Sequence, residues 1–197
     1  MKFASHYVAD QVTQRIYAER DKVKQFLRAT EGESRYGALR GYLYEPMVHT
    51  ILRNGGKFSY HKLRTGKSAK IPTERTLELE RTVLTEFSNI SEINEEKKFY
   101  RPKQAKFPAL IAPKYIFQIT TGLSHPIPMA RLADIANHLA TLQNSNTPKI
   151  KLFFVLPPHI YPSFRKQLFH TLEKQVAPQI PSILLKVKQY AICMSFD

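Results

Sequence analysis

The sequence IKLFFVL at residues 150–156 is the stretch around which the rest of the chain must be arranged. An almost entirely apolar run of this length, rich in aromatic and β-branched side chains, predicts a buried strand. Pro157 and Pro158 follow at once, and because proline donates no ladder hydrogen bond the strand should end there. The run is also far too short to cross a bilayer.

The segments on either side alternate between helix and strand patterns. Helices are predicted where apolar residues recur at helical spacing, over residues 5–29, 35–53, 132–142 and 161–176. Strands are predicted where apolar residues alternate or run together, over residues 57–63, 76–87, 107–111, 115–121 and 184–194. The pattern at 76–87 also fits a helix, and the strand is favoured there. This order predicts an α/β fold in which helices flank a mixed central sheet. We expect residues 1–34 to form an extra N-terminal helix and linker, and residues 35–197 to form one domain.

The composition favours a polyanionic partner. Lysine and arginine total 30 of the 197 residues against 16 aspartate and glutamate, which gives a net charge of +14. Such an excess suits nucleic acid first and an anionic membrane surface second. The lone Cys193 excludes an internal disulfide framework and a multi-cysteine zinc site. The first residues show no apolar signal segment, so we expect a soluble protein of a reducing compartment.

The positive charge is gathered in blocks. Residues 35–71 hold eight basic residues and one acid, and residues 97–114 hold six basic residues and no acid, whereas residues 72–96 hold seven acids. A blocky pattern suits a groove better than a uniform coat. Two dense segments, 62–70 and 97–106, are therefore expected to bind the nucleic-acid backbone, and the second carries Phe99 and Tyr100, which could stack on bases. The predicted binding residues are Lys62, Arg64, Lys67, Lys70, Lys97, Lys98, Arg101, Lys103 and Lys106.

Several short motifs carry a resemblance to a known family. They are LRGYLYE (39–45), GGKF (55–58), FYRP (99–102), FPA (107–109), FQIT (117–120), HPI (125–127) and FFVLP (153–157). In this order and spacing, residues 35–195 resemble the C-terminal nuclease-fold domain of Crinkler and retrotransposon-hot-spot type effectors. The resemblance implies the PD-(D/E)XK, or restriction-endonuclease-like, fold and action on nucleic acid, often in a host nucleus. The P-loop that precedes this domain in many such effectors is absent from the sequence.

The resemblance also implies where a nuclease site would lie. In that superfamily an acid ends the second core strand and an acid-x-Lys pair lies on the third, and together they hold Mg²⁺. Ile111 stands where an aspartate is expected, and Gln118 and Thr120 stand where the acid and the lysine are expected. Glu45 is the remaining acid, and His125 follows nearby. We therefore expect a degenerate, inactive site lined by Glu45, Gln118 and His125, with no metal or other cofactor.

Each of these three residues could instead serve a purely structural role. Glu45 can pair with a neighbouring arginine, Gln118 can satisfy backbone groups, and His125 can cap a helix. A working Mg²⁺-dependent nuclease remains an alternative if Asp134 or Glu86 enters the site. A third alternative is a protein-interaction module in which the predicted helix at 5–29 binds a partner or a second copy of the chain. The partner we expect is nucleic acid, DNA in the first place, and not a membrane.

Overall fold

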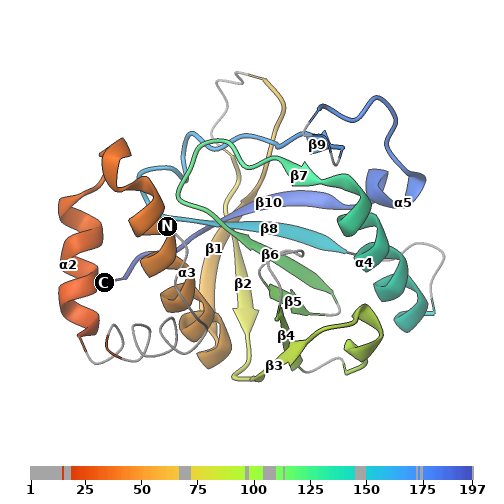
Figure 1. The fold of residues 1–197 in the computed structure, drawn as a ribbon, viewed down its shortest axis with the longest axis horizontal. Coiled ribbons are helices and arrows are strands. Elements are labelled where there is room, and N and C mark those ends of the chain that lie inside the picture. The colour runs from red at the N-terminus through yellow and green to blue at the C-terminus, as the bar shows by residue number, and fades with distance from the viewer. Residues whose placement is uncertain are drawn as a thin grey trace.

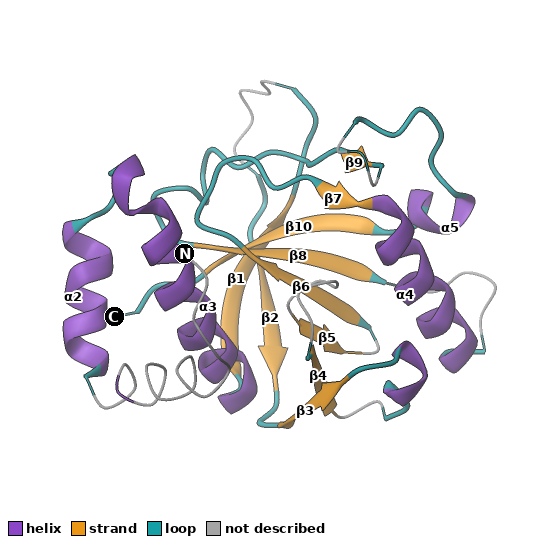
Figure 2. Cartoon of the chain, in the orientation of Figure 1, coloured by secondary structure: helices purple, strands orange, loops and turns teal. Residues whose placement is uncertain are grey.

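The fold is described from a computed structural model of the chain (Figure 1 and Figure 2). The residues that it describes are 15, 19–66, 72–95, 98–103, 110–112, 114–144, 150–171, 173 and 175–196. Four of the predicted binding residues, Lys67, Lys70, Lys97 and Lys106, lie outside these ranges. So do residues 107–109 of one motif and most of the first predicted helix.

Among the described residues, a mixed sheet of eight strands forms the centre of the fold. In spatial order the strands are β2 (Arg75–Leu79), β1 (Gly56–Lys62), β10 (Lys188–Cys193), β8 (Lys151–Leu156), β6 (Tyr115–Ile119), β5 (Leu110–Ala112), β4 (Lys98–Pro102) and β3 (Val83–Phe87). The stretch at 150–156 is thus a central strand, parallel to both of its neighbours, β6 and β10. A second, two-stranded sheet pairs β7 (Ile127–Pro128) with β9 (Phe169–His170).

The sheet twists and curls until its two edges approach each other. The chain passes from β2 to β3 through residues 80–82 alone, although these strands are the opposite edges. At about 4.8 Å per strand, crossing a flat eight-stranded sheet would take roughly 34 Å. The link between Leu79 and Val83 spans at most about 14 Å. The right-handed twist of successive strands therefore has to bring the edges together, and Figure 1 shows the strands fanning out from one region.

Helices cover both faces of the sheet, as an α/β fold requires. The helices α2 (Arg20–Ala29) and α3 (Gly37–Asn54) pack on one face, where Val23, Leu27, Val48 and Leu52 share a core with Phe117 and Phe153. The helices α4 (Met129–Leu142) and α5 (Ser182–Leu185) pack on the other face, around Ile116, Phe154 and Ile135. The predicted α/β class with a mixed, helix-flanked sheet is confirmed. The division of the chain at residue 34 stays a prediction.

The helix predicted over residues 161–176 is wrong. Residues 161–171 of this segment form turns, an irregular stretch and strand β9, and two of their amide hydrogens bind partners far away in the sequence. The Lys166 amide donates to the Arg64 carbonyl oxygen at 3.1 Å, and the Gln167 amide donates to Gln189 Oε1 at 2.8 Å. An amide that donates to a residue outside the segment cannot make the hydrogen bond to the carbonyl four residues before it that an α-helix requires.

Two further boundaries differ from the prediction. The segment expected to be one strand over 184–194 begins with α5 and becomes strand β10 only at Lys188. The segment at 76–87 forms two separate edge strands, β2 and β3, rather than one.

Candidate nucleic-acid interface

The sheet register collects cations from four neighbouring strands on the face that α3 covers. Lys62 lies opposite Tyr190, and Arg75 lies opposite Tyr60. The other two cations lie opposite each other at the starts of β8 and β10. Paired residues share a face, and both tyrosines belong to the core on the α3 side. We call this surface the cationic sheet face; it comprises Lys62, Arg75, Lys151 and Lys188.

Three tyrosine rings surround the Lys151 ammonium at the β8 end of this surface. The Lys151 ammonium nitrogen lies 5.9 Å from each of the ring centroids of Tyr60, Tyr115 and Tyr190. Contacts of this kind contribute about 0.5–1 kcal/mol each at partly exposed sites. Burial raises the pKa of the Tyr190 hydroxyl, and the guanidinium of Arg75 acts in the opposite direction, so this arginine also lies close. Lys151 is therefore positioned before any ligand arrives.

No acid interrupts this surface within the four strands. The residues that alternate onto it from β1, β2, β8 and β10 are cationic, aromatic or aliphatic. The acid of β2, Glu78, points to the opposite face, where it pairs with Lys57 at 3.9 Å. Lys62, Arg75 and Lys188 are exposed. The register places the four cations on a diagonal: Arg75 stands level with Ile192, Lys62 with Tyr190, and Lys151 with Lys188. At about 4.8 Å per strand and about 3.3 Å per residue, this diagonal row is roughly 20 Å long and forms a strip suited to a phosphate backbone.

The structure treats the two predicted basic segments differently. From the first segment, Lys62 joins the cationic sheet face, while Arg64 lies just beyond the end of β1. From the second segment, Lys98 and Arg101 are ion-paired with Glu95 and Glu86. Lys103 is exposed at the end of β4. In the order of the sheet, four strands lie between β1, which carries Lys62, and β4, which carries Lys98 and Arg101.

The aromatic residues of the second segment cannot stack on bases. Phe99 is 5% exposed and Tyr100 is 1% exposed, and they point into opposite cores of the sheet. The Tyr100 hydroxyl also accepts hydrogen bonds from the backbone amides of Asn94 and Glu95. Both rings are therefore parts of the fold. Base stacking through this segment, one of our expectations, is wrong for these two residues.

Glu45 lies in a small pocket at the end of strand β6. The pocket has a volume of about 330 Å³ and is lined by Gly37, Ala38, Gly41, Tyr42, Tyr44, Glu45, Ile119, Thr120 and Thr121. Glu45 and Thr120 thus line the same pocket. About half of the Glu45 side chain is exposed. Partial burial nevertheless raises the pKa of its carboxyl, and the Arg101 guanidinium partly offsets that effect. Among the described residues, Glu45 is the one carboxylate that lines this pocket.

Gln118 and His125 lie on the other side of the sheet from Glu45. Gln118 is opposite Phe154 in the pairing of β6 with β8, and the His125 ring packs edge-on against Phe154 at 6.0 Å. Phe154 belongs to the core under α4. The three predicted site residues are therefore not brought together. Gln118 Oε1 is buried without a hydrogen-bond partner among the described residues, and the His125 amide donates to Gln167 Oε1 at 2.7 Å.

The remaining candidate acids and metal sites can also be placed. Glu86 is engaged by Arg101, and Asp134 is exposed on α4, across the sheet from Glu45. Ile111 is fully buried in the core under α4. Within the described ranges, no group of three histidine, cysteine, aspartate or glutamate side chains is arranged to hold a metal ion. Among the described helices, none has the length and apolar character needed to cross a membrane.

Sequence reasoning missed three of the four cations on the cationic sheet face. Arg75, Lys151 and Lys188 lie outside the two dense basic segments, and the last two have one lysine each nearby, Lys149 and Lys186. Each of them is the first residue of its strand, and every second residue from it onward faces α3. This alternation within β2, β8 and β10 was the signal in the sequence that could have located them. Their convergence depends on the strand order, which the sequence does not display.

The fold and this surface define a class: a mixed α/β domain with an acid-free cationic sheet face. The chain is 31% identical over 169 residues to Crinkler effector protein 15 of Phytophthora infestans, a match that covers 83% of this chain and 26% of that protein. Crinkler effector protein 16 of the same organism matches with the same identity and coverage. This homology supports a Crinkler-like family, and the chain spans about a quarter of the length of these curated relatives. No family model matches the chain, and no solved structure matches it.

Proposed function

We propose that this chain is a nucleic-acid-binding domain of a Crinkler-like effector, that DNA is its first target, and that it acts inside a host cell, including the nucleus. The observation that carries the binding proposal is the row of four cations on the cationic sheet face, with no acid among the strand residues that share it. The relatives are named effector proteins, and that role comes to this chain as part of the proposal.

Binding through this surface is electrostatic and independent of base sequence. The tyrosines Tyr60 and Tyr190 are each 7% exposed, so they support Lys151 rather than stack on bases. Cations that contact phosphates release condensed counterions, and each such contact contributes about −0.9 to the slope of log K against log salt for duplex DNA. If all four cations bind phosphates, they supply a slope of about −3.6.

We further propose that the pocket at Glu45 is a degenerate nuclease site of the PD-(D/E)XK type. Support comes from the residue types at the positions that the motifs assign. Ile111 cannot ligate a metal, Thr120 carries no positive charge, and Gln118 faces away from Glu45. One carboxylate is a poor holder of a catalytic Mg²⁺, which is usually bound through one or two carboxylates together with substrate phosphates.

The test of binding compares two double variants of equal net charge. Lys62→Ala with Lys188→Ala removes two exposed cations from the cationic sheet face, whereas Lys22→Ala with Lys57→Ala removes two exposed lysines from elsewhere. Fluorescence anisotropy with a labelled duplex at several salt concentrations gives affinity and slope. We expect the first variant to lose about 1.8 from the magnitude of the slope. The control should lose little of it.

Equal losses in the two variants would show that binding is a general effect of net charge and would refute the proposed surface. Affinity that does not change with salt would instead favour the protein-interaction alternative. Incubation with supercoiled plasmid and Mg²⁺ or Mn²⁺ tests the pocket. Nicking that disappears in Glu45→Ala would refute the degenerate site and establish a working nuclease.

A further inference from the structure

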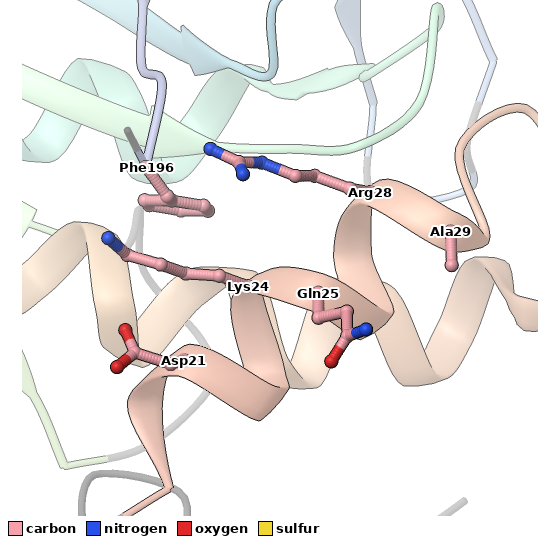
Figure 3. A pocket seen from close by; sticks show the side chains of 6 residues that line it. All are labelled: Asp21, Lys24, Gln25, Arg28, Ala29 and Phe196. Atoms are coloured by element: carbon pink, nitrogen blue, oxygen red, sulfur yellow. The ribbon is translucent and has the colours of Figure 1, made fainter.

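A second cavity lies near the pocket at Glu45, with which it shares Tyr44, between α2, α3 and the segment that follows β10. Its volume is about 410 Å³, within the range of small-molecule sites. It is lined by Lys24, Leu27, Arg28, Glu31, Arg40, Tyr44, Pro157, Pro158, His159, Met194, Ser195 and Phe196. A neighbouring hollow, seen in Figure 3, shares Lys24, Arg28 and Phe196 with it and adds Asp21.

Cations from two helices converge on this cavity. Lys24 and Arg28 are four residues apart on α2, so they lie on one face of the helix. In Figure 3 both side chains extend from α2 toward the Phe196 ring. Arg40 reaches the cavity from α3. Among the described lining residues Glu31 is the one carboxylate, and its Oε1 lies 2.5 Å from His159 Nδ1. The described lining therefore holds three cationic side chains and one carboxylate.

Two donors in the wall are buried without a partner. Arg40 is 6% exposed, and its Nη1 donates to the Thr30 carbonyl oxygen at 2.9 Å, which fixes the plane of the guanidinium. Arg40 Nε and the hydroxyl of Tyr44, which is 2% exposed, have no hydrogen-bond partner in the described part of the chain. A buried donor without a partner is costly, so a ligand that accepts these hydrogen bonds is favoured.

The rest of the wall is apolar and suits a planar group. Phe196 packs edge-on against the Tyr44 ring, with the ring centroids 5.1 Å apart. Pro157, Pro158 and Met194 complete this side of the cavity. A site with a cationic wall and an aromatic wall suits a ligand that has an anionic end and a flat, apolar end.

We propose that this cavity binds a phosphate monoester that carries a planar group, the chemistry of a nucleoside monophosphate. The guanidinium of Arg40, the Tyr44 hydroxyl and the cations of α2 take the phosphate, and the planar group packs on Phe196. The same chemistry has two sources: a free nucleotide, or the 5′-phosphorylated end of a nucleic-acid strand. The proposal does not depend on the cationic sheet face, which draws on different strands and residues.

Calorimetric titration tests the proposal with AMP, adenosine and inorganic phosphate as probes. We expect AMP to bind and adenosine not to bind. The double variant Lys24→Ala with Arg28→Ala should weaken AMP binding at least about tenfold, because charge-assisted contacts are the strong ones. Tyr44→Phe removes only one hydroxyl and should weaken binding by about threefold to tenfold. Lys22→Ala, an exposed lysine on the same helix, is the matched control and should bind as the wild type does.

A 5′-phosphorylated trinucleotide and the same trinucleotide without its phosphate distinguish the two sources. These titrations use the Lys62→Ala, Lys188→Ala variant, in which the cationic sheet face is weakened. Trinucleotide binding that remains in this variant is then assigned to the cavity, so failure of one site is distinguished from failure of the other. Tighter binding of the phosphorylated trinucleotide than of AMP assigns the cavity to a strand end; the reverse order assigns it to a free nucleotide. Two results overturn the proposal. The first is that neither AMP nor the 5′-phosphorylated trinucleotide binds saturably at millimolar concentration. The second is that AMP binds with unchanged affinity both to the Lys24→Ala, Arg28→Ala variant and to Tyr44→Phe.

Discussion

His49 should make the stability of this domain fall in mild acid. The imidazole lies on α3 with 6% of its side chain exposed, and its Nε2 atom has no hydrogen-bond partner among the described residues. Glu45 Oε1 is 3.9 Å from Nε2, beyond hydrogen-bond distance. Burial first, and the nearby Arg101 guanidinium second, lower the pKa of His49 to about 4. The folded protein therefore holds this side chain neutral at pH 7.

The size of the effect follows from proton linkage. An unfolded histidine has a pKa of about 6.5. Between that pH and about pH 4, His49 is therefore protonated in the unfolded state and neutral in the folded state. The contribution of His49 to stability is fully present above about pH 6.5 and is lost as the pH falls toward 4. A pKa of about 4 in the folded state corresponds to about 3 kcal/mol in total, of which about 2 kcal/mol is lost between about pH 7.5 and about pH 5.

The assay compares wild type with His49→Leu, which fills a similar volume and leaves no buried polar atom. Urea unfolding followed by circular dichroism gives the free energy of unfolding at about pH 7.5 and about pH 5. We expect wild type to lose about 2 kcal/mol more than the variant over this interval. Other histidines with lowered pKa values, His61, His125 and His159, act in both proteins and cancel in the difference. If both proteins lose stability in parallel, His49 is not the buried neutral group described here.

Phe153→Ala should lower the free energy of unfolding, measured in urea, by about 3–5 kcal/mol. The ring is fully buried, and the centroids of four aromatic rings lie within 5.7 Å of its own centroid. A loss under about 1 kcal/mol would contradict this packing. Gly55→Ala should destabilise the domain by more than about 1 kcal/mol, since φ is 76° and a Cβ would stand 2.5 Å from the Leu79 carbonyl oxygen. Gly32→Ala, with φ at 80° and open space around it, is the control for conformational strain alone, and equal losses at the two glycines would show that the clash is absent. Lys151→Met should keep the packing on the tyrosines and reduce the salt slope of duplex binding by about 0.9 in magnitude; an unchanged slope would place this ammonium outside the interface.

Local periodicity was enough to locate the elements that form the middle of the fold. The apolar run at 150–156 became β8 and the stretch at 115–121 became β6, because strands buried on both faces need continuous apolar sequence. The spacing of Leu132, Ile135 and Leu139 became the buried face of α4 for the equivalent reason at a period of 3.6. The motifs around these elements also predicted the Crinkler-like relationship that the homology supports.

Sequence by itself therefore determined the α/β class, the central strands and the cationic character of the chain. Only the tertiary structure decided which side chains meet. Glu45 and Gln118 came to lie on opposite faces because a residue's face depends on where α3 packs, which no local pattern records. The apolar spacing at 161–176 failed to make a helix because Arg64 and Gln189 take its amide hydrogens. The cationic sheet face exists because strand order places residues more than a hundred positions apart on adjacent strands, as it does Lys62 on β1 and Lys188 on β10.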